Sequence, residues 1–172
     1  MPLAGTAHYQ FPSTPYTTQD FKFTWYNGAR KPSVDLLLGE KDSKRANPKP
    51  MTKLPDQGSV FVGEKGNMLL EHVAGPRFFP YDQFVGTKKP DLKNVDHYHQ
   101  WVNAALGTTE ASAPFSYAAP LTEGVLLGLV ASYFPNEKLK WDAEKMAFND
   151  NDKANSRLRR TYRKGWEVEG LS

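Results

Sequence analysis

The alternating segment 21–26 is the feature that most narrows the folds open to this chain. It reads Phe-Lys-Phe-Thr-Trp-Tyr, so Phe21, Phe23 and Trp25 fall on one side of an extended strand. Asn27-Gly28 follows directly, and both residue types tolerate the positive φ of a tight turn. The segment therefore predicts a β-strand with one aromatic face. Its other face is polar and must meet solvent, a ligand or another subunit.

More strands are predicted on either side of this one. A shorter strand is expected at residues 7–11. Later, two apolar runs at 59–63 and 67–73 flank a Glu-Lys-Gly turn, which predicts a β-hairpin. Residues 29–58 contain prolines that break any period, so they predict a long loop.

Helices are predicted in the second half of the chain. Asp96 is a suitable N-cap for a helix over 96–106. A second helix is expected over 120–134, and it is apolar nearly all round, which predicts that it is buried. The tail is predicted to hold a helix at 151–160 and a strand-like piece at 166–168.

Together these elements predict the fold class. Hairpins followed by helices and a strand-like tail indicate an α+β protein with a largely antiparallel, open β-sheet and helices packed on one face. At 172 residues the chain is expected to form a single domain.

Composition excludes several kinds of site. The chain has no cysteine, so disulfides, thiolate catalysis and iron–sulfur clusters are excluded. Its net charge of +3 is too weak to indicate a nucleic-acid partner by itself. The most apolar stretch, residues 125–134, is far short of the ~20 residues that a membrane span needs. We expect a soluble protein with no membrane partner, and a cytoplasmic location is favoured over a periplasmic one.

An ordered set of motifs carries a resemblance to a known family. The motifs are Phe-Thr-Trp-Tyr-Asn-Gly at 23–28, Gly-Glu-Lys-Gly at 63–66, Tyr-Ala-Ala-Pro-Leu-Thr-Glu-Gly-Val-Leu-Leu-Gly at 117–128, Leu-Lys-Trp-Asp at 139–142, and an ending with Asn155, Arg159-Arg160, Tyr162-Arg163 and Lys164-Gly165-Trp166. In this order, roughly residues 6–170 resemble the bacterial C-terminal domain of Gfo/Idh/MocA-type oxidoreductases, the group of glucose-fructose oxidoreductase and inositol dehydrogenase.

The resemblance implies a fold, a partner and a substrate class. In that family the C-terminal domain is α+β, and its open sheet commonly forms the subunit interface, which implies a homo-oligomer. NAD or NADP sits on a separate N-terminal Rossmann domain. Substrates are sugars, cyclitols or their derivatives, which are oxidised or reduced by hydride transfer.

The chain departs from the family at the residues that would perform this chemistry. It contains no G-x-G, which a Rossmann domain needs to approach the pyrophosphate of the cofactor. None of its Glu-Lys pairs is followed by proline, so the family's Glu-Lys-Pro motif with its catalytic lysine is missing. No Asp lies four residues before a His, so the family's acid/base pair has no counterpart. We therefore assign no catalytic and no cofactor-binding residue, and expect the chain to need a missing Rossmann partner.

Four residues are candidates for binding a substrate. His97 and Trp101 lie one helical turn apart with Tyr98 adjacent, and imidazole nitrogens bond sugar hydroxyls while aromatic rings stack on a sugar's C–H face. The alternative is a histidine that borders the core and bonds to backbone. Arg77 follows Gly75-Pro76 and is suited to hold a carboxylate, or to form a structural ion pair.

Two other patterns in the sequence do not predict a functional site. His97 and His99 point about 200° apart on a helix and cannot chelate one metal ion, so no metal site is predicted. Five cations lie within eight residues, at Arg157, Arg159, Arg160, Arg163 and Lys164. We interpret them as a solvated helix end, with a phosphate or nucleic-acid patch as the alternative.

Two functional hypotheses follow. The first is the substrate-side and oligomerisation domain of an NAD(P)-dependent sugar or cyclitol oxidoreductase, which is not catalytic alone. The second is a non-catalytic binding or scaffold protein derived from that domain.

Overall fold

The computed structural model describes residues 4–37, 51–88 and 90–170. The fold class is α+β, with small antiparallel sheets and helices, as predicted. Contacts between residues divide the chain into two compact units. Unit 1 contains Met1–Ala29 and Val95–Ser172, and unit 2 contains Arg30–Asn94.

Unit 1 begins with a two-stranded antiparallel sheet of β1 (Gly5–Phe11) and β2 (Phe21–Asn27). The register runs from Gly5 opposite Asn27 to Phe11 opposite Phe21, so the aromatic residues of both strands share one face. The predicted turn is present. Gly28 has φ 69°, and its N–H donates to the side-chain oxygen of Asn27 at 2.9 Å.

Helix α2 (His97–Ala105) begins where the sequence predicts. The Asp96 carboxylate accepts the backbone N–H groups of Tyr98 and His99 at 2.9 and 3.0 Å, which satisfies two N–H groups that the helix leaves open. Gly107, at φ 73°, adopts the left-handed conformation that ends many helices.

Helix α3 (Phe115–Ala131) differs from the prediction in two ways. It starts five residues before Pro120, with Pro114 as its N-cap, so Pro120 lies inside the helix. The prediction that the helix is buried is wrong for most of its length. Val130 is its one buried residue, whereas Leu121 is 58% and Val125 50% exposed. Unit 1 supplies packing partners for only one side of this helix.

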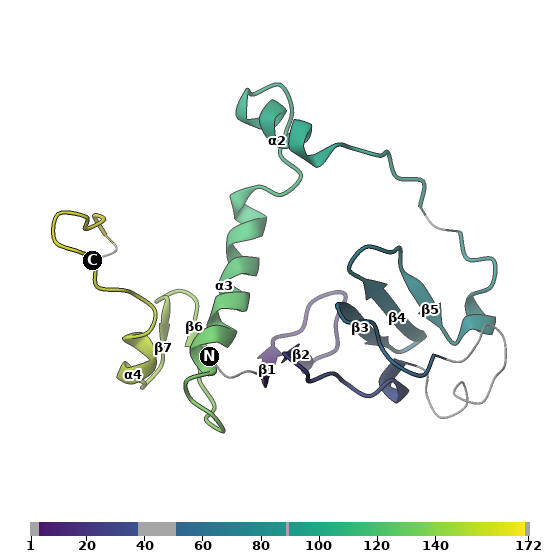
Figure 1. Ribbon diagram of the computed structural model, residues 1–172, viewed down its shortest axis with the longest axis horizontal. Coiled ribbons are helices and arrows are strands. Elements are labelled where there is room, and N and C mark those ends of the chain that lie inside the picture. Colours follow the sequence, from purple (N-terminus) through teal and green to yellow (C-terminus); the bar gives the residue numbers. More distant parts are fainter. Residues whose placement is uncertain (1–3, 38–50, 89, 171–172) are drawn as a thin grey trace. The chain divides into compact units, whose positions relative to one another are not determined.

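The core of unit 1 lies at the C-terminal end of α3 (Figure 1). Here β6 (Trp141–Asp142) pairs with β7 (Ala147–Phe148), and α4 (Asp152–Asn155) follows. The buried residues are Val130, Phe148 and Ala154.

The tail is less regular than the sequence predicts. The helix expected at 151–160 is only the four residues of α4, and residues 166–168 form no strand. The segment 156–170 instead consists of turns and irregular backbone. The strand-like reading of 166–168 was wrong because strand geometry needs a pairing partner, and these residues have none among the described strands.

Unit 2 holds a three-stranded antiparallel sheet in the order β3 (Gly58–Gly63), β4 (Gly66–Glu71), β5 (Arg77–Phe79). The hairpin of β3 and β4 is confirmed. Strand β5 and the short 3-10 helix η1 (Tyr81–Phe84) were not among the predicted elements.

The predicted long loop at 29–58 is anchored to this sheet. Residues 38–50 of the loop lie outside the described residues. On either side of them, Leu37 is fully buried and Leu54 is 7% exposed, and both pack with Leu69 of β4 as the core of unit 2. The side-chain amide of Asn67 donates to the Leu37 carbonyl at 2.9 Å, which fixes the start of the loop.

The strands of the described residues are divided among three small sheets, where we expected one open sheet. Antiparallel pairing is confirmed in all three. Within the described residues, no helix is long and apolar enough to cross a membrane.

Candidate functional site

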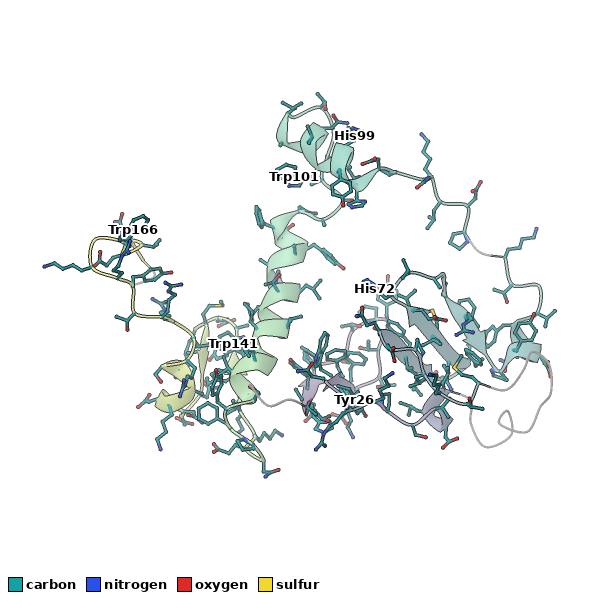
Figure 2. The ribbon with its side chains drawn as sticks, viewed as in Figure 1. Tyr26, His72, His99, Trp101, Trp141 and Trp166 are labelled. Carbon is teal, nitrogen blue, oxygen red and sulfur yellow. The ribbon has the colours of Figure 1, made fainter. Side chains whose placement is uncertain are left out.

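Helix α2 brings three of the four predicted site residues together. His97 and Tyr98 are adjacent, with ring centroids 4.1 Å apart and ring planes inclined by 35°. Trp101 lies one turn further along and is 73% exposed, as is Tyr98 (Figure 2). The helix thus presents an exposed aromatic surface with an imidazole at its edge.

The loop after α2 is tied back to the helix by two side-chain hydrogen bonds. The Ser112 hydroxyl donates to the side-chain oxygen of Gln100 at 2.6 Å, and the Thr108 hydroxyl donates to the Asn103 carbonyl at 3.0 Å. These bonds hold residues 107–114 against the helix.

Arg77, the fourth candidate, is part of unit 2 and is already engaged. Its guanidinium forms an ion pair with the carboxylate of Glu71 on the neighbouring strand β4. The sequence left two roles open for Arg77, and in the structure it forms the structural ion pair. Leaving Glu71 for an incoming carboxylate would expose an unpaired charge, so Arg77 is a weak candidate for substrate binding.

The histidines of α2 do not form a metal site with their neighbours. Among the described residues no group of three or more His, Asp and Glu side chains is placed to hold a metal ion. His99 instead lies beside the helix cap, with its Nδ1 3.5 Å from Oδ2 of Asp96. That carboxylate is already used by the first backbone N–H groups of α2.

The second candidate surface is the aromatic face of the β1–β2 sheet, which consists of Tyr9, Phe11, Phe21, Phe23 and Trp25. Tyr9 lies opposite Phe23, and their ring centroids are 5.3 Å apart. Trp25 extends the row, 6.4 Å from Phe23. Phe11, Phe23 and Trp25 remain between 38% and 49% exposed. The sequence predicted this row, but we expected helices to cover it.

Helix α3 contacts the aromatic face at Tyr9, in the middle of the row. The Tyr9 hydroxyl lies directly against Gly128, where even a Cβ atom would collide with it. Burial raises the pKa of the Tyr9 hydroxyl, an effect that the Gly128 backbone only partly offsets. On the other side of α3, Glu123 accepts the indole N–H of Trp141 at 2.6 Å. These two contacts orient α3 between the sheet and the unit 1 core.

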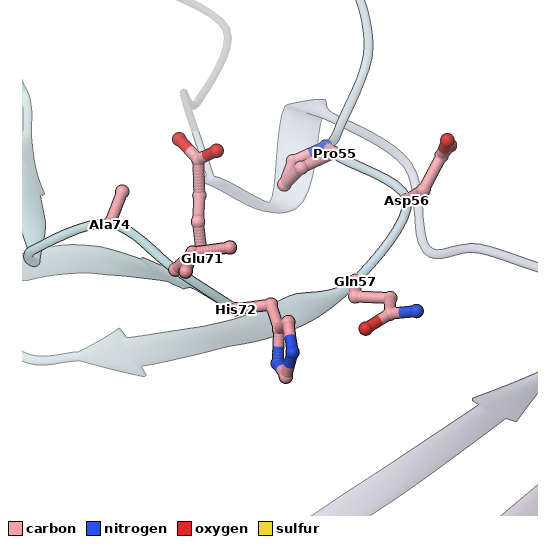
Figure 3. A pocket seen from close by; sticks show the side chains of 7 residues that line it. Pro55, Asp56, Gln57, Glu71, His72 and Ala74 are labelled. Atoms are coloured by element: carbon pink, nitrogen blue, oxygen red, sulfur yellow. The ribbon is translucent and has the colours of Figure 1, made fainter.

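Sequence reasoning missed a hollow in unit 2. It has a volume of about 440 Å³ and is lined by Pro55, Asp56, Gln57, Glu71, His72, Val73 and Ala74. Figure 3 shows Glu71 and His72 on opposite sides of the strand end, with Gln57 across from His72. Both carboxylates are neutralised, Glu71 by Arg77 and Asp56 by the Lys31 ammonium at 2.6 Å, which lowers the pKa of Asp56. The hollow therefore offers little unpaired charge for catalysis or metal binding.

Comparisons with known proteins give no assignment. No family model matches the chain, and no curated protein or solved structure matches it. The features of the chain that point to a function are its sequence motifs and the surfaces described above.

Proposed function

We propose that this chain is the substrate-side and oligomerisation domain of an NAD(P)-dependent oxidoreductase of the Gfo/Idh/MocA type. The substrates would be sugars, cyclitols or their derivatives. The chain would not transfer hydride alone, because the nucleotide-binding half is supplied by a separate Rossmann domain. The ordered motifs between residues 23 and 166 support the family, and the α+β fold class agrees with it.

We expected the subunit contact on the open, polar face of the sheet. The observation that carries the oligomerisation role is instead the exposed aromatic face of β1–β2. Its rings form a continuous row, yet three of them stay more than a third exposed. Apolar surface of this kind favours association, because burying about 100 Å² of it contributes roughly 2.5 kcal/mol. A second copy of the chain that covers the row would remove it from water.

The substrate-side role rests on the exposed rings of α2. Trp101 and Tyr98 are open to stack on the C–H face of a sugar, and His97 is positioned to bond its hydroxyls. Because Arg77 is paired with Glu71, we leave it out of the proposed contacts.

The oligomerisation role is tested by two lysine substitutions on the same strand. Trp25→Lys places a charge on the aromatic face, and Tyr26→Lys places one on the opposite face, where Tyr26 is also partly exposed. We expect sedimentation equilibrium to show that the native chain self-associates. Trp25→Lys should raise the dissociation constant of the oligomer at least about tenfold, whereas Tyr26→Lys should change it little. A monomeric native chain, or the larger effect in Tyr26→Lys, would contradict the role of the aromatic face.

Calorimetric titration with NADH and NADPH tests the absence of a cofactor site. We expect no saturable binding at micromolar concentrations, since no G-x-G loop is present to approach a pyrophosphate. Saturable one-to-one binding at micromolar affinity would mean that the chain holds its own cofactor site. In that case the proposal that a separate Rossmann domain binds the cofactor is wrong.

The genes around this one distinguish the scaffold alternative from the oxidoreductase proposal. A reading frame for G-x-G-x-x-G in the same transcription unit supports the oxidoreductase. Its absence, together with self-association of the chain, would favour a non-catalytic scaffold.

A further inference from the structure

The tail after α4 contains three arginines that each lie over an aromatic ring. The guanidinium carbon of Arg157 is 4.6 Å from the ring centre of Tyr133. That of Arg160 is 5.1 Å from Tyr162, and that of Arg163 is 4.7 Å from Trp166. These distances are within the range of cation–π attraction. Stacking holds the long arginine side chains in fixed positions, which lowers the entropy lost when they bind a ligand.

A turn at the end of the tail produces the last of these pairs. The Trp166 N–H donates to the Arg163 carbonyl at 2.9 Å, and Gly165 has the left-handed φ of 82° that such a turn requires. The carboxylate of Glu167 accepts the Gly165 N–H at 2.7 Å and closes the turn. Arg163 and Trp166, the first and last residues of the turn, thereby come together on one side.

Our interpretation of the cations as a solvated helix end does not fit this geometry. Helix α4 ends at Asn155, and a helix of four residues has a weak dipole, so the cations lie beyond any helix that would attract them. Among the described residues, none of the five cations forms an ion pair with a carboxylate. Arg159 donates to the Gly170 carbonyl at 3.3 Å. No side-chain bond of this kind is formed by Arg160 or Arg163 within the part of the chain that the structure describes.

Arg160 and Arg163 both line a hollow of about 440 Å³, together with Tyr162, Trp166 and Val168. Trp166 is 67% exposed and stands out in the terminal loop (Figure 2). A guanidinium that uses its flat face on a ring keeps its edge N–H groups for ligand oxygens. The hollow therefore combines two planar cationic donors with aromatic walls.

We propose that this hollow binds the phosphate group of a small phosphorylated molecule. Two arginine forks offer more N–H donors than one carboxylate can accept, whereas a phosphate monoester has three terminal oxygens and nearly two negative charges. The organic part of the ligand would rest against the exposed side of Trp166. This site is independent of the proposed oxidoreductase role, and each is tested without the other.

The test uses the indole N–H signals of the four tryptophans in the ¹H–¹⁵N NMR spectrum. Glucose 6-phosphate, glucuronate and glucose are titrated into the full chain. We expect glucose 6-phosphate to shift the Trp166 signal saturably with a dissociation constant of about a millimolar or tighter, and to leave Trp141 unmoved. Glucose is expected to cause no shift, and glucuronate to bind at least about tenfold more weakly.

Two conservative variants make the test specific. Arg163→Lys keeps the charge but loses the planar fork, and we expect it to weaken glucose 6-phosphate binding about tenfold. Arg159→Lys is the matched control and is expected to keep native affinity, because that guanidinium is turned to Gly170. Each of three results would overturn the proposal: no Trp166 shift with glucose 6-phosphate, equal affinity for glucuronate, or equal losses in the two variants.

Discussion

At the residue scale, Asn155 is the clearest case of a motif residue whose role the structure explains. Its side-chain oxygen accepts the Phe148 N–H at 2.7 Å, and its side-chain nitrogen donates to the Phe148 carbonyl at 2.9 Å. The amide thus completes both backbone bonds of a buried residue, as a neighbouring strand would. Only an amide side chain carries a donor and an acceptor in this arrangement.

We predict that Asn155→Asp destabilises unit 1 by about 1–3 kcal/mol. The carboxylate keeps the acceptor but has no donor, so the Phe148 carbonyl loses its partner and faces a negative oxygen. Urea unfolding followed by tryptophan fluorescence measures the loss, because Trp141 packs on Phe148 with ring centroids 5.1 Å apart.

Asn149→Asp is the matched control for this change. Asn149 is exposed, and only its backbone N–H is bonded, to the Lys140 carbonyl at 2.8 Å. We expect its unfolding free energy to stay within about 0.5 kcal/mol of the native value. Equal losses in the two variants would show that the added charge, and not the Asn155 amide, accounts for the effect.

At the element scale, two glycines one turn apart on α3 have opposite surroundings. A Cβ atom at Gly124 would meet nothing within 4 Å, whereas one at Gly128 would overlap the Tyr9 hydroxyl. Glycine weakens a helix interior by about 1 kcal/mol relative to alanine. Only at Gly128 does the missing side chain serve the contact between α3 and β1.

We predict that Gly124→Ala stabilises the chain by up to about 1 kcal/mol and that Gly128→Ala does not. In Gly128→Ala the Tyr9 ring must move, at a cost of about 1–3 kcal/mol for overpacking. Thermal unfolding monitored by circular dichroism compares the two variants.

The variant Tyr9→Phe completes the test as a double-mutant cycle. Removing the hydroxyl relieves the closest overlap and leaves the ring carbon Cζ 3.0 Å from the new methyl group. Tyr9→Phe with Gly128→Ala should therefore be more stable than Gly128→Ala alone. If the two changes were additive, the contact between Tyr9 and α3 would have no energetic weight.

At the scale of the whole molecule, each unit has its own buried cluster. Leu37, Leu54 and Leu69 belong to unit 2, while Val130, Phe148 and Ala154 belong to unit 1. All four tryptophans lie in unit 1, so tryptophan fluorescence reports on that unit, whereas circular dichroism reports on both.

We predict that the two units unfold as separate cooperative transitions. Leu69→Ala should lower the stability of unit 2 by about 2–5 kcal/mol, because Leu69 is 1% exposed. The urea transition seen by circular dichroism should then shift, while the fluorescence transition stays in place. Leu70→Ala, on the exposed side of the same strand, is the control and should shift neither transition measurably. A fluorescence transition that moves with Leu69→Ala would mean that the chain unfolds as one unit.

The candidate site was predictable where its residues are neighbours in sequence. His97, Tyr98 and Trp101 follow one helix, so the cap at Asp96 and the helical period were sufficient to group them. Arg77 was not predictable in the same way, because its role depends on Glu71 across a strand pair. The hollow at His72 was missed for the same reason, since it joins the loop before β3 to the end of β4.

Local signals were enough for the elements that depend on neighbours along the chain. The alternation of β2, the Asn27-Gly28 turn and the cap of α2 involve interactions over a few residues, and all three are confirmed. Tertiary contacts decided the rest. An apolar helix such as α3 buries only the side for which other segments supply partners, and the position of those segments is not encoded in its own period. The same reason explains why Arg157 lies over Tyr133, a ring more than twenty residues away, where composition alone indicated a solvated charge.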